Sequence, residues 1–189
     1  MNYEKLKSTV ADWLHRTDLN KVIPTFIKLA ESRINRDIRV AEMETEIVGD
    51  VDGNDIELPD NYRQIKFLMI DGTPVNYVSN LQGHAYTNNI LGYTQINNKI
   101  RPFAKEGSKY QLVYYAQVPS LSEDEPENWL LSKYPDIYLY AALIESAPYI
   151  KDDGRVATWA TAYQNAITTL MQQNEIQRFG DTGLTIRRA

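Results

Sequence analysis

Residues 23–39, IPTFIKLAESRINRDIR, decide how the first part of the chain folds. Apolar residues recur there every three or four positions, as one face of an α-helix requires: Ile23, Phe26, Ile27, Ala30, Ile34 and Ile38. Pro24 is tolerated because it falls in the first turn, and Asp18 or Asn20 is placed to cap this helix. Residues 3–16 have the same spacing, so the sequence predicts two helices packed as an antiparallel hairpin.

From Glu44 the apolar period changes to two, which is typical of β-strands. Residues 65–70 predict a buried strand, and Asp71-Gly72 predicts a tight turn with residues 74–78 returning beside it. Asn97-Asn98 predicts a second hairpin. In residues 110–118, YQLVYYAQV, alternate side chains share one face. Five or six such strands predict a small antiparallel sandwich or barrel.

Helical patterns resume after an acidic linker. Asn128 is placed to cap a short helical turn, Pro135 stands where a helix begins, and Pro148 is expected to end or kink it. A further helix should run to about Gln177. The predicted fold class is α+β: an antiparallel bundle of about four helices with an inserted β lobe. The predicted domains are residues 1–42 with 127–177 for the bundle, 43–126 for the β lobe with its linker, and 178–189 for an extended C-terminal tail.

Composition excludes several kinds of chemistry. The chain has 189 residues, a net charge of −5 and no cysteine, so disulfides, thiolate nucleophiles and cysteine-ligated metals are excluded. Two histidines, His15 and His84, cannot build a metal cluster, and no cofactor is expected. No segment approaches the roughly 18 apolar residues of a membrane span, and no signal-peptide pattern opens the chain. We therefore expect a soluble product without a cleaved export signal.

Motifs for catalysis are scarce. The sequence has no glycine-rich loop followed by Lys-Ser/Thr, no pair of histidines four residues apart, and no Gly-x-Ser-x-Gly elbow. Glycoside cleavage needs only two carboxylates about 5 to 9.5 Å apart. Glu44 and Glu46 share a strand face, and Glu145 lies beside an apolar helix stripe. Solvated acids are the simpler interpretation, and Glu145 is equally suited to pairing with an arginine across a subunit boundary.

Two features favour binding over catalysis. Thirteen tyrosines against four phenylalanines fit an interface, because tyrosine suits sites where one end of the ring is packed and the other is wet; they fit the edge of a small β core equally well. Arg33, Arg36 and Arg39 fall off the apolar side of the second predicted helix. They form either a solvated face or a docking face for an acidic partner or DNA. The net acidity argues against tight nucleic-acid binding by the whole surface.

Several spaced motifs together have a family resemblance. They are Trp13-Leu14-x-Arg16-x-Asp18-Leu19, the residues from Ile23-Pro24 to Arg36, Leu58-Pro59-x-x-Tyr62, Asn128-Trp129-Leu130-Leu131, Pro135-Asp136-x-Tyr138-Leu139-Tyr140, Asp152-Asp153-x-Arg155 and Trp159. This combination resembles the head-to-tail adaptors, or connectors, of podovirus-type tailed bacteriophages, which include tail tubular protein A and the tail accessory factors. The likeness covers almost the whole chain.

The resemblance implies a structural protein of the virion, not an enzyme, that is present in the host cytoplasm during assembly. Such adaptors form a ring, commonly of twelve copies, below the portal protein at the tail vertex; they support the tail nozzle protein and complete the DNA-filled head. The partners implied are sister copies, portal, nozzle and genomic DNA that passes without specific binding, with no membrane. The implied portal contacts are in the tail: Arg178, Phe179, Leu184, Ile186, Arg187 and Arg188. The rival function is a tail peptidoglycan hydrolase with two carboxylates, because some tail accessory proteins are credited with cell-wall cleavage.

Overall fold

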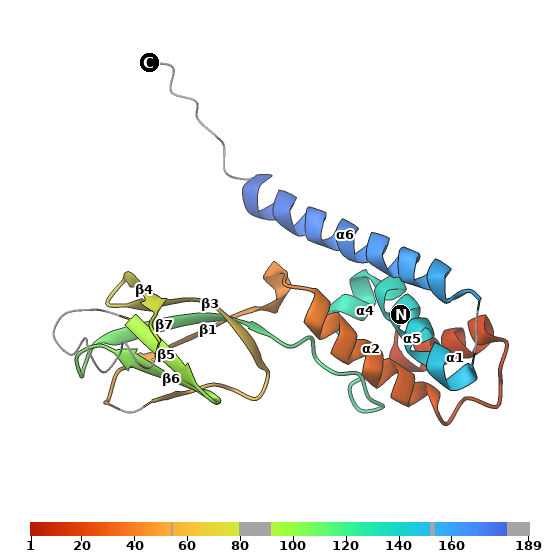
Figure 1. Ribbon diagram of the computed structural model, residues 1–189, viewed down its shortest axis with the longest axis horizontal. Helices are drawn as coiled ribbons and strands as arrows, with labels where there is room; N and C mark the ends of the chain where they lie inside the picture. The colour runs from red at the N-terminus through yellow and green to blue at the C-terminus, as the bar shows by residue number, and fades with distance from the viewer. Residues whose placement is uncertain (54, 80–91, 152–153, 181–189) are drawn as a thin grey trace, which may run out of the picture. The chain divides into compact units, whose positions relative to one another are not determined.

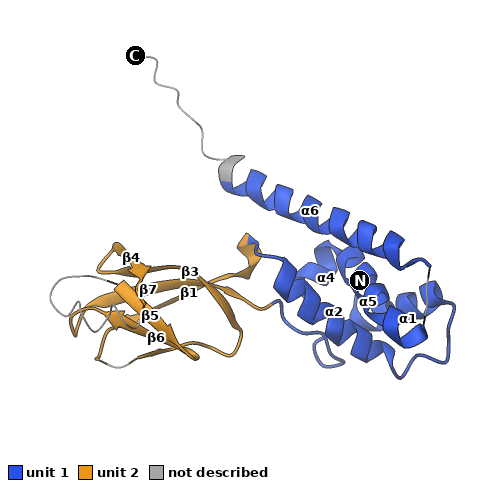
Figure 2. Ribbon diagram, in the orientation of Figure 1, with its two compact units in different colours: residues 1–40, 118–189 blue, residues 41–117 orange. Residues whose placement is uncertain are grey.

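The computed structural model describes residues 1–53, 55–79, 92–151 and 154–180. The chain divides into two compact units, coloured separately in Figure 2. The helical unit comprises residues 1–40 and 118–189, and the β unit comprises residues 41–117. Helices and strands are therefore segregated along the chain, which confirms the predicted α+β class.

The helical unit contains five α-helices among its described residues. They are α1 (Tyr3–Leu14), α2 (Ile23–Asp37), α4 (Trp129–Lys133), α5 (Pro135–Ile150) and α6 (Val156–Gly180) (Figure 1). Helix α5 packs against both α2 and α6, and α1 also contacts it. Its residues Ile137, Tyr138, Ala141, Ala142 and Leu143 are fully buried. The core of this unit is therefore built around α5.

The ends of α1 and α2 are fixed by different means. The Asn2 side chain accepts a hydrogen bond from the Lys5 amide at 2.9 Å, and His15 ends α1 in the left-handed region with φ 53°. Helix α2 begins after Val22 without a side-chain cap. The prediction that Asp18 or Asn20 caps it was wrong. The Asp18 carboxylate instead accepts two hydrogen bonds from Arg16, at 2.6 and 2.7 Å.

For the later helices, the predicted first residues agree with the structure better than the predicted last residues do. The Asn128 side chain accepts from the Leu131 amide at 2.8 Å, which confirms it as the cap of α4. Pro148 lies inside α5, which ends two residues later. Helix α6 continues to Gly180, so Arg178 and Phe179 are helical and do not belong to an extended tail as predicted. Gly180 is the first strong helix breaker after Gly154, and no residue before it stops the helix.

The β unit is one curled sheet. A short 3-10 helix, Ala41–Met43, precedes β1 (Glu44–Asp50), β2 (Ile56–Glu57), β3 (Tyr62–Ile70), β4 (Thr73–Tyr77), β5 (Gly92–Ile96), β6 (Lys99–Phe103) and β7 (Lys109–Ala116). The strand order is β1-β7-β3-β4-β5-β6-β2. The described residues form seven strands, whereas five or six were predicted. They form one sheet and not a two-sheet sandwich.

One pairing contradicts the predicted antiparallel arrangement. Strands β4 and β5 are parallel, with Asn76 opposite Gly92, whereas the other pairs are antiparallel. The two strands are separated by residues 78–91, which is long enough for the crossover that a parallel pair needs. The predicted hairpins are confirmed. Asp71 and Gly72 have φ values of 49° and 75° between β3 and β4, and Asn97 has φ 54° between β5 and β6.

Alternate residues of the strands build the core of the β unit. The buried members are Ile56, Leu58, Leu68, Ile70, Val75, Ile100, Leu112, Tyr114 and Ala116. Three of these lie on β7, on the face that the alternation predicted. The ring of Tyr110 covers Gly49 so closely that a Cβ there would lie 2.7 Å from the tyrosine oxygen. Tyrosines occur in both predicted settings, because Tyr114 is buried and Tyr77 is exposed.

Candidate interaction sites

The predicted basic run on α2 is only partly available to a partner. The Arg33 Nε donates to Glu145 Oε1 on α5 at 2.6 Å, and both side chains are largely covered. The Arg39 guanidinium donates to the carbonyl oxygens of Asn35, at 2.9 Å, and Ile38. Arg36 is the exposed member of the three. The structure thus uses two of these arginines within the helical unit.

The carboxylates considered for glycoside cleavage also have partners. Glu145 binds Arg33, Glu44 Oε2 accepts from Lys66 Nζ at 2.7 Å, and Glu46 accepts from the Gln111 side chain. Glu145 belongs to the helical unit and the other two acids belong to β1 of the β unit. These contacts tie neighbouring elements together. Each of the three acids therefore contacts a side chain of a neighbouring element, whereas the hydrolase hypothesis requires two carboxylates that face each other.

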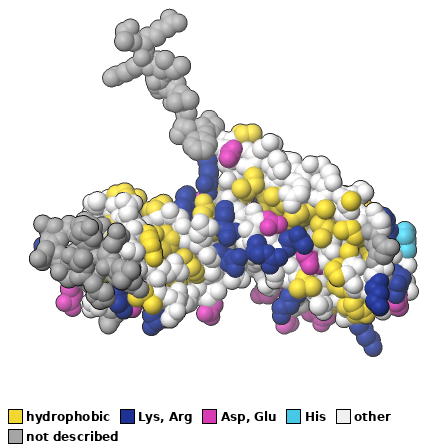
Figure 3. Space-filling view, in the orientation of Figure 1, with side chains coloured by type: hydrophobic (Ala, Val, Ile, Leu, Met, Phe, Trp, Pro, Cys, Tyr) yellow, Lys and Arg dark blue, Asp and Glu magenta, His cyan; other side chains and the backbone are white. Residues whose placement is uncertain are grey.

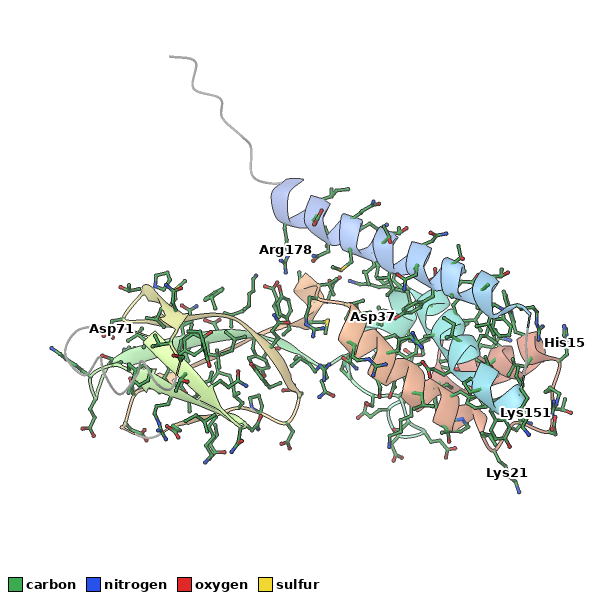
Figure 4. All side chains as sticks on the ribbon, in the orientation of Figure 1. His15, Lys21, Asp37, Asp71, Lys151 and Arg178 are labelled. Carbon is green, nitrogen blue, oxygen red and sulfur yellow. The ribbon has the colours of Figure 1, made fainter. Side chains whose placement is uncertain are left out.

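His15 lies exposed at the end of α1, where Figure 4 labels it. No group of three His, Asp or Glu residues in the described ranges is placed to hold a metal ion. His84 lies outside the described residues. Within the same ranges, no helix has the length and apolar character needed to cross a membrane.

A buried polar cluster on α2 holds the chain where it returns from the β unit. Glu31 Oε1 accepts from the Leu121 amide at 2.6 Å, and Asn35 Oδ1 accepts from the Val118 amide at 2.8 Å. Both side chains are only 7% exposed. Burial raises the pKa of Glu31, while the hydrogen bond from Leu121 lowers it by a smaller amount. Glu31 and Asn35 therefore fix the backbone of residues 118–121 against α2.

We expect Glu31→Ala to lower the free energy of unfolding by about 1–3 kcal/mol, because the Leu121 amide would lose its acceptor in a buried site. Glu31→Gln keeps an acceptor oxygen and should lose less. The pKa of Glu31 is higher in the folded protein than in the unfolded chain, where it is about 4.3. Between these two pKa values the folded protein binds more protons than the unfolded chain, so lowering the pH through this window should stabilise the wild type relative to the Gln variant. Urea unfolding of the three proteins between neutral and acidic pH measures this; a pH-independent difference would contradict it.

A second polar contact joins α2 to α6. The Tyr163 hydroxyl donates to Asp37 Oδ2 at 2.8 Å, and Tyr163 is 1% exposed. Burial and the Asp37 carboxylate both raise the pKa of Tyr163, so it remains a neutral hydrogen-bond donor. Figure 4 labels Asp37 near the C-terminal end of α2. This contact positions α6 against the rest of the helical unit.

An aromatic pocket of about 550 Å³ lies at the N-terminal end of α6. It is lined by Asp12, Trp13, His15, Tyr140, Arg155, Thr158, Trp159 and Ala162. The Trp13 and Tyr140 rings meet edge to face at 5.8 Å, and Trp13 is 42% exposed. The Arg155 guanidinium lies 4.9 Å from the Trp159 ring centre and donates to the Trp13 carbonyl oxygen at 3.0 Å. The pocket thus combines aromatic rings with the charged side chains of Asp12 and Arg155.

Comparison with known proteins decides the family. The model of the SU10 adaptor protein family matches residues 1–187. The chain belongs to the SU10 adaptor protein family. A search of curated proteins gives no match to this SU10 adaptor.

Membership of the SU10 adaptor family confirms the predicted phage adaptor and makes the protein a structural component of the bacteriophage virion. The predicted tail contacts are only partly described. Arg178 and Phe179 lie in α6, and Leu184, Ile186, Arg187 and Arg188 lie outside the described residues. Sequence reasoning missed Glu31 and Asn35, because polar residues four apart also occur on the exposed side of α2, as Ser32 and Arg36 do.

Proposed function

We propose that this SU10 adaptor joins the portal protein to the tail nozzle as a ring at the tail vertex and thereby completes the DNA-filled head. The observation that carries the proposal is the family match over nearly the whole chain. The fold also supports it, because the polar contacts of Arg33, Glu31 and Tyr163 hold parts of the helical unit together. A ring of twelve copies is the number that the resemblance to podovirus-type adaptors favours.

The physical properties of the chain suit this role. A closed ring needs one face of a subunit to bind a different face of the next subunit. The helical unit supplies rigid helix surfaces for such contacts. The net charge of −5 suits a channel that passes DNA, because an acidic wall repels phosphate.

We propose that the C-terminal residues bind the portal, with Leu184 and Ile186 supplying apolar contacts and Arg187 and Arg188 supplying charge. Deleting residues 181–189 should abolish binding to purified portal, measured by sedimentation, and leave the melting temperature unchanged. The deletion starts after Gly180 so that α6 stays complete. A variant with residues 181–189 in scrambled order is the matched control for length and charge, and it should also fail to bind. Full portal binding by the deletion variant would contradict this assignment.

A further inference from the structure

Strand β1 is a long edge of the sheet. The strand order places β1 and β2 at the two ends, so each has a neighbour on one side only among the described strands. Strand β2 has two residues, whereas β1 has seven and pairs with β7 in an unbroken register from Glu44 to Asp50. Edge strands are commonly protected by shortness, a bulge, proline or lysine. Strand β1 has none of these, and its charged residues are all acidic, so its edge is open to a strand of matching charge.

Hydrogen bonds just beyond β1 show which way its backbone groups point. The Val51 amide donates to the Ser108 carbonyl oxygen, and the Val51 carbonyl oxygen accepts from the Gly107 amide, both at 2.7 Å. Val51 therefore directs both of its backbone groups toward the segment that leads into β7. Because this direction alternates from one residue of a strand to the next, Asp50 directs its backbone groups the other way, to the free edge.

The contacts of β7 give the same direction. Lys109 lies opposite Asp50, yet its amide donates to the Asp71 carboxylate and its carbonyl oxygen accepts from the Asp71 amide, both at 2.8 Å. Lys109 therefore bonds on the side of β7 that faces away from β1. By the same alternation, Glu46 and Val48 also direct their N–H and C=O groups outward. No other described strand lies beside these groups to pair with them.

The side chains of Glu46, Val48 and Asp50 share the outer face of the sheet. The residues between them face the core, against which Ile47 packs. Val48 is 63% exposed, and the two acids beside it are exposed as well. Figure 3 shows that the β unit exposes apolar side chains next to charged ones. The β1 edge thus presents one apolar side chain between two carboxylates.

This order of side chains determines which strand can pair with the edge. An apolar residue suits the position opposite Val48, and Lys or Arg suits the positions opposite Glu46 and Asp50, because opposite charges across a strand pair stabilise it. The Glu46 carboxylate accepts one hydrogen bond from Gln111 and keeps its second oxygen for a further donor. Strand β1 of a second copy does not suit this edge, because it would place acid opposite acid. Nucleic acid is excluded because its phosphates would be repelled.

We infer that the β1 edge binds an extended segment of another protein with the pattern basic-x-apolar-x-basic. The segment adds a further strand to the sheet: its backbone hydrogen bonds supply affinity, and its alternate side chains supply specificity. The inference goes beyond the proposed function, because it concerns a partner other than a sister copy and does not depend on ring formation.

A peptide with this pattern, acetyl-Thr-Lys-Thr-Val-Thr-Lys-Thr-amide, tests the inference on the full chain. Added to nitrogen-15-labelled protein, it should shift the amide signals of Glu46, Val48 and Asp50 in a saturable way and slow their exchange with solvent. The same peptide with glutamate in place of both lysines should bind at least about tenfold more weakly. Equal affinity for the two peptides, saturable shifts confined to other residues, or the absence of saturable shifts would overturn the inference.

Two variants of the protein test the same edge. Val48→Pro removes an outward N–H, keeps the hydrogen bonds to β7 and should abolish peptide binding. Glu46→Lys combined with Asp50→Lys leaves the backbone edge intact and should reverse the preference, so that the glutamate peptide binds more tightly. The control, Asp124→Lys with Glu125→Lys, makes the same change of charge at exposed acids of the helical unit and should keep the wild-type preference. Binding by folded Val48→Pro, or an unchanged preference in the Glu46/Asp50 variant, would overturn the inference.

Discussion

Trp159→Ala should lower the free energy of unfolding by about 3–5 kcal/mol, the range for removing a large aromatic side chain from a core. Trp159 is 3% exposed on the inner side of α6, and the Arg155 guanidinium covers part of its ring. Because Trp159 lines the aromatic pocket, its removal would enlarge that pocket into the core. Urea unfolding followed by the helical circular dichroism signal measures the change.

Trp13→Ala is the control for that experiment. Trp13 lines the same pocket but is 42% exposed, so its truncation should destabilise the protein by less than half as much. Equal losses for the two variants would contradict the distinction between a core ring and an exposed ring. A near-neutral Trp159→Ala would place Trp159 outside the core.

Asn128→Ala should cause the second large loss of stability. The Asn128 side chain caps α4 through the Leu131 amide, and its Nδ2 donates to the Pro119 carbonyl oxygen at 2.6 Å and to the Tyr138 hydroxyl at 2.7 Å. Losing the cap costs about 1 kcal/mol, and each buried group left without its partner costs about 1–3 kcal/mol. Thermal and urea unfolding should both show the loss.

Asn128→Asp separates the two contributions. The aspartate keeps an oxygen to cap the Leu131 amide but has no N–H to donate to Pro119 or Tyr138. We expect a loss that is smaller than that of the alanine variant yet clearly measurable. Wild-type stability in the aspartate variant would show that the cap alone matters.

The helices were largely predictable because their signals are local. The apolar stripe of α2, Pro24 in its first turn and the Asn128 cap each lie within one or two turns of the element that they define. The cap of α2 was mispredicted because Asp18 has a competing partner, Arg16, two residues away. The end of α6 was placed about three residues early, because Arg178 and Phe179 were assigned to the tail when only Gly180 breaks the helix.

The sheet was less predictable because pairing is not local. The turn at Asp71-Gly72 identifies β3 and β4 as neighbours, and the alternation in β7 identifies its buried face. No sequence signal between β4 and β5 predicts that they pair in parallel. The pairing depends on the path of the connection between them, which residue types alone do not determine. The two-residue strand β2 is too short to show a period.

The candidate sites, like the fold, were predictable only where their signals are local. A run such as Arg33, Arg36 and Arg39 is visible in the sequence, but whether each arginine is available depends on partners far along the chain, such as Glu145. The sequence shows directly that residues 156–174 contain no Asp, Glu, Lys or Arg, but it does not show which of them α6 exposes. Exposure itself follows from packing against α5 and could not be assigned beforehand.

Electron cryomicroscopy of the tail vertex tests the central claim most directly. In wild-type particles, class averages should show a closed ring of this chain between the portal and the nozzle, with neighbouring copies in contact. Particles in which the protein is absent from the vertex, or is present only as isolated monomers that do not contact one another, would contradict the account.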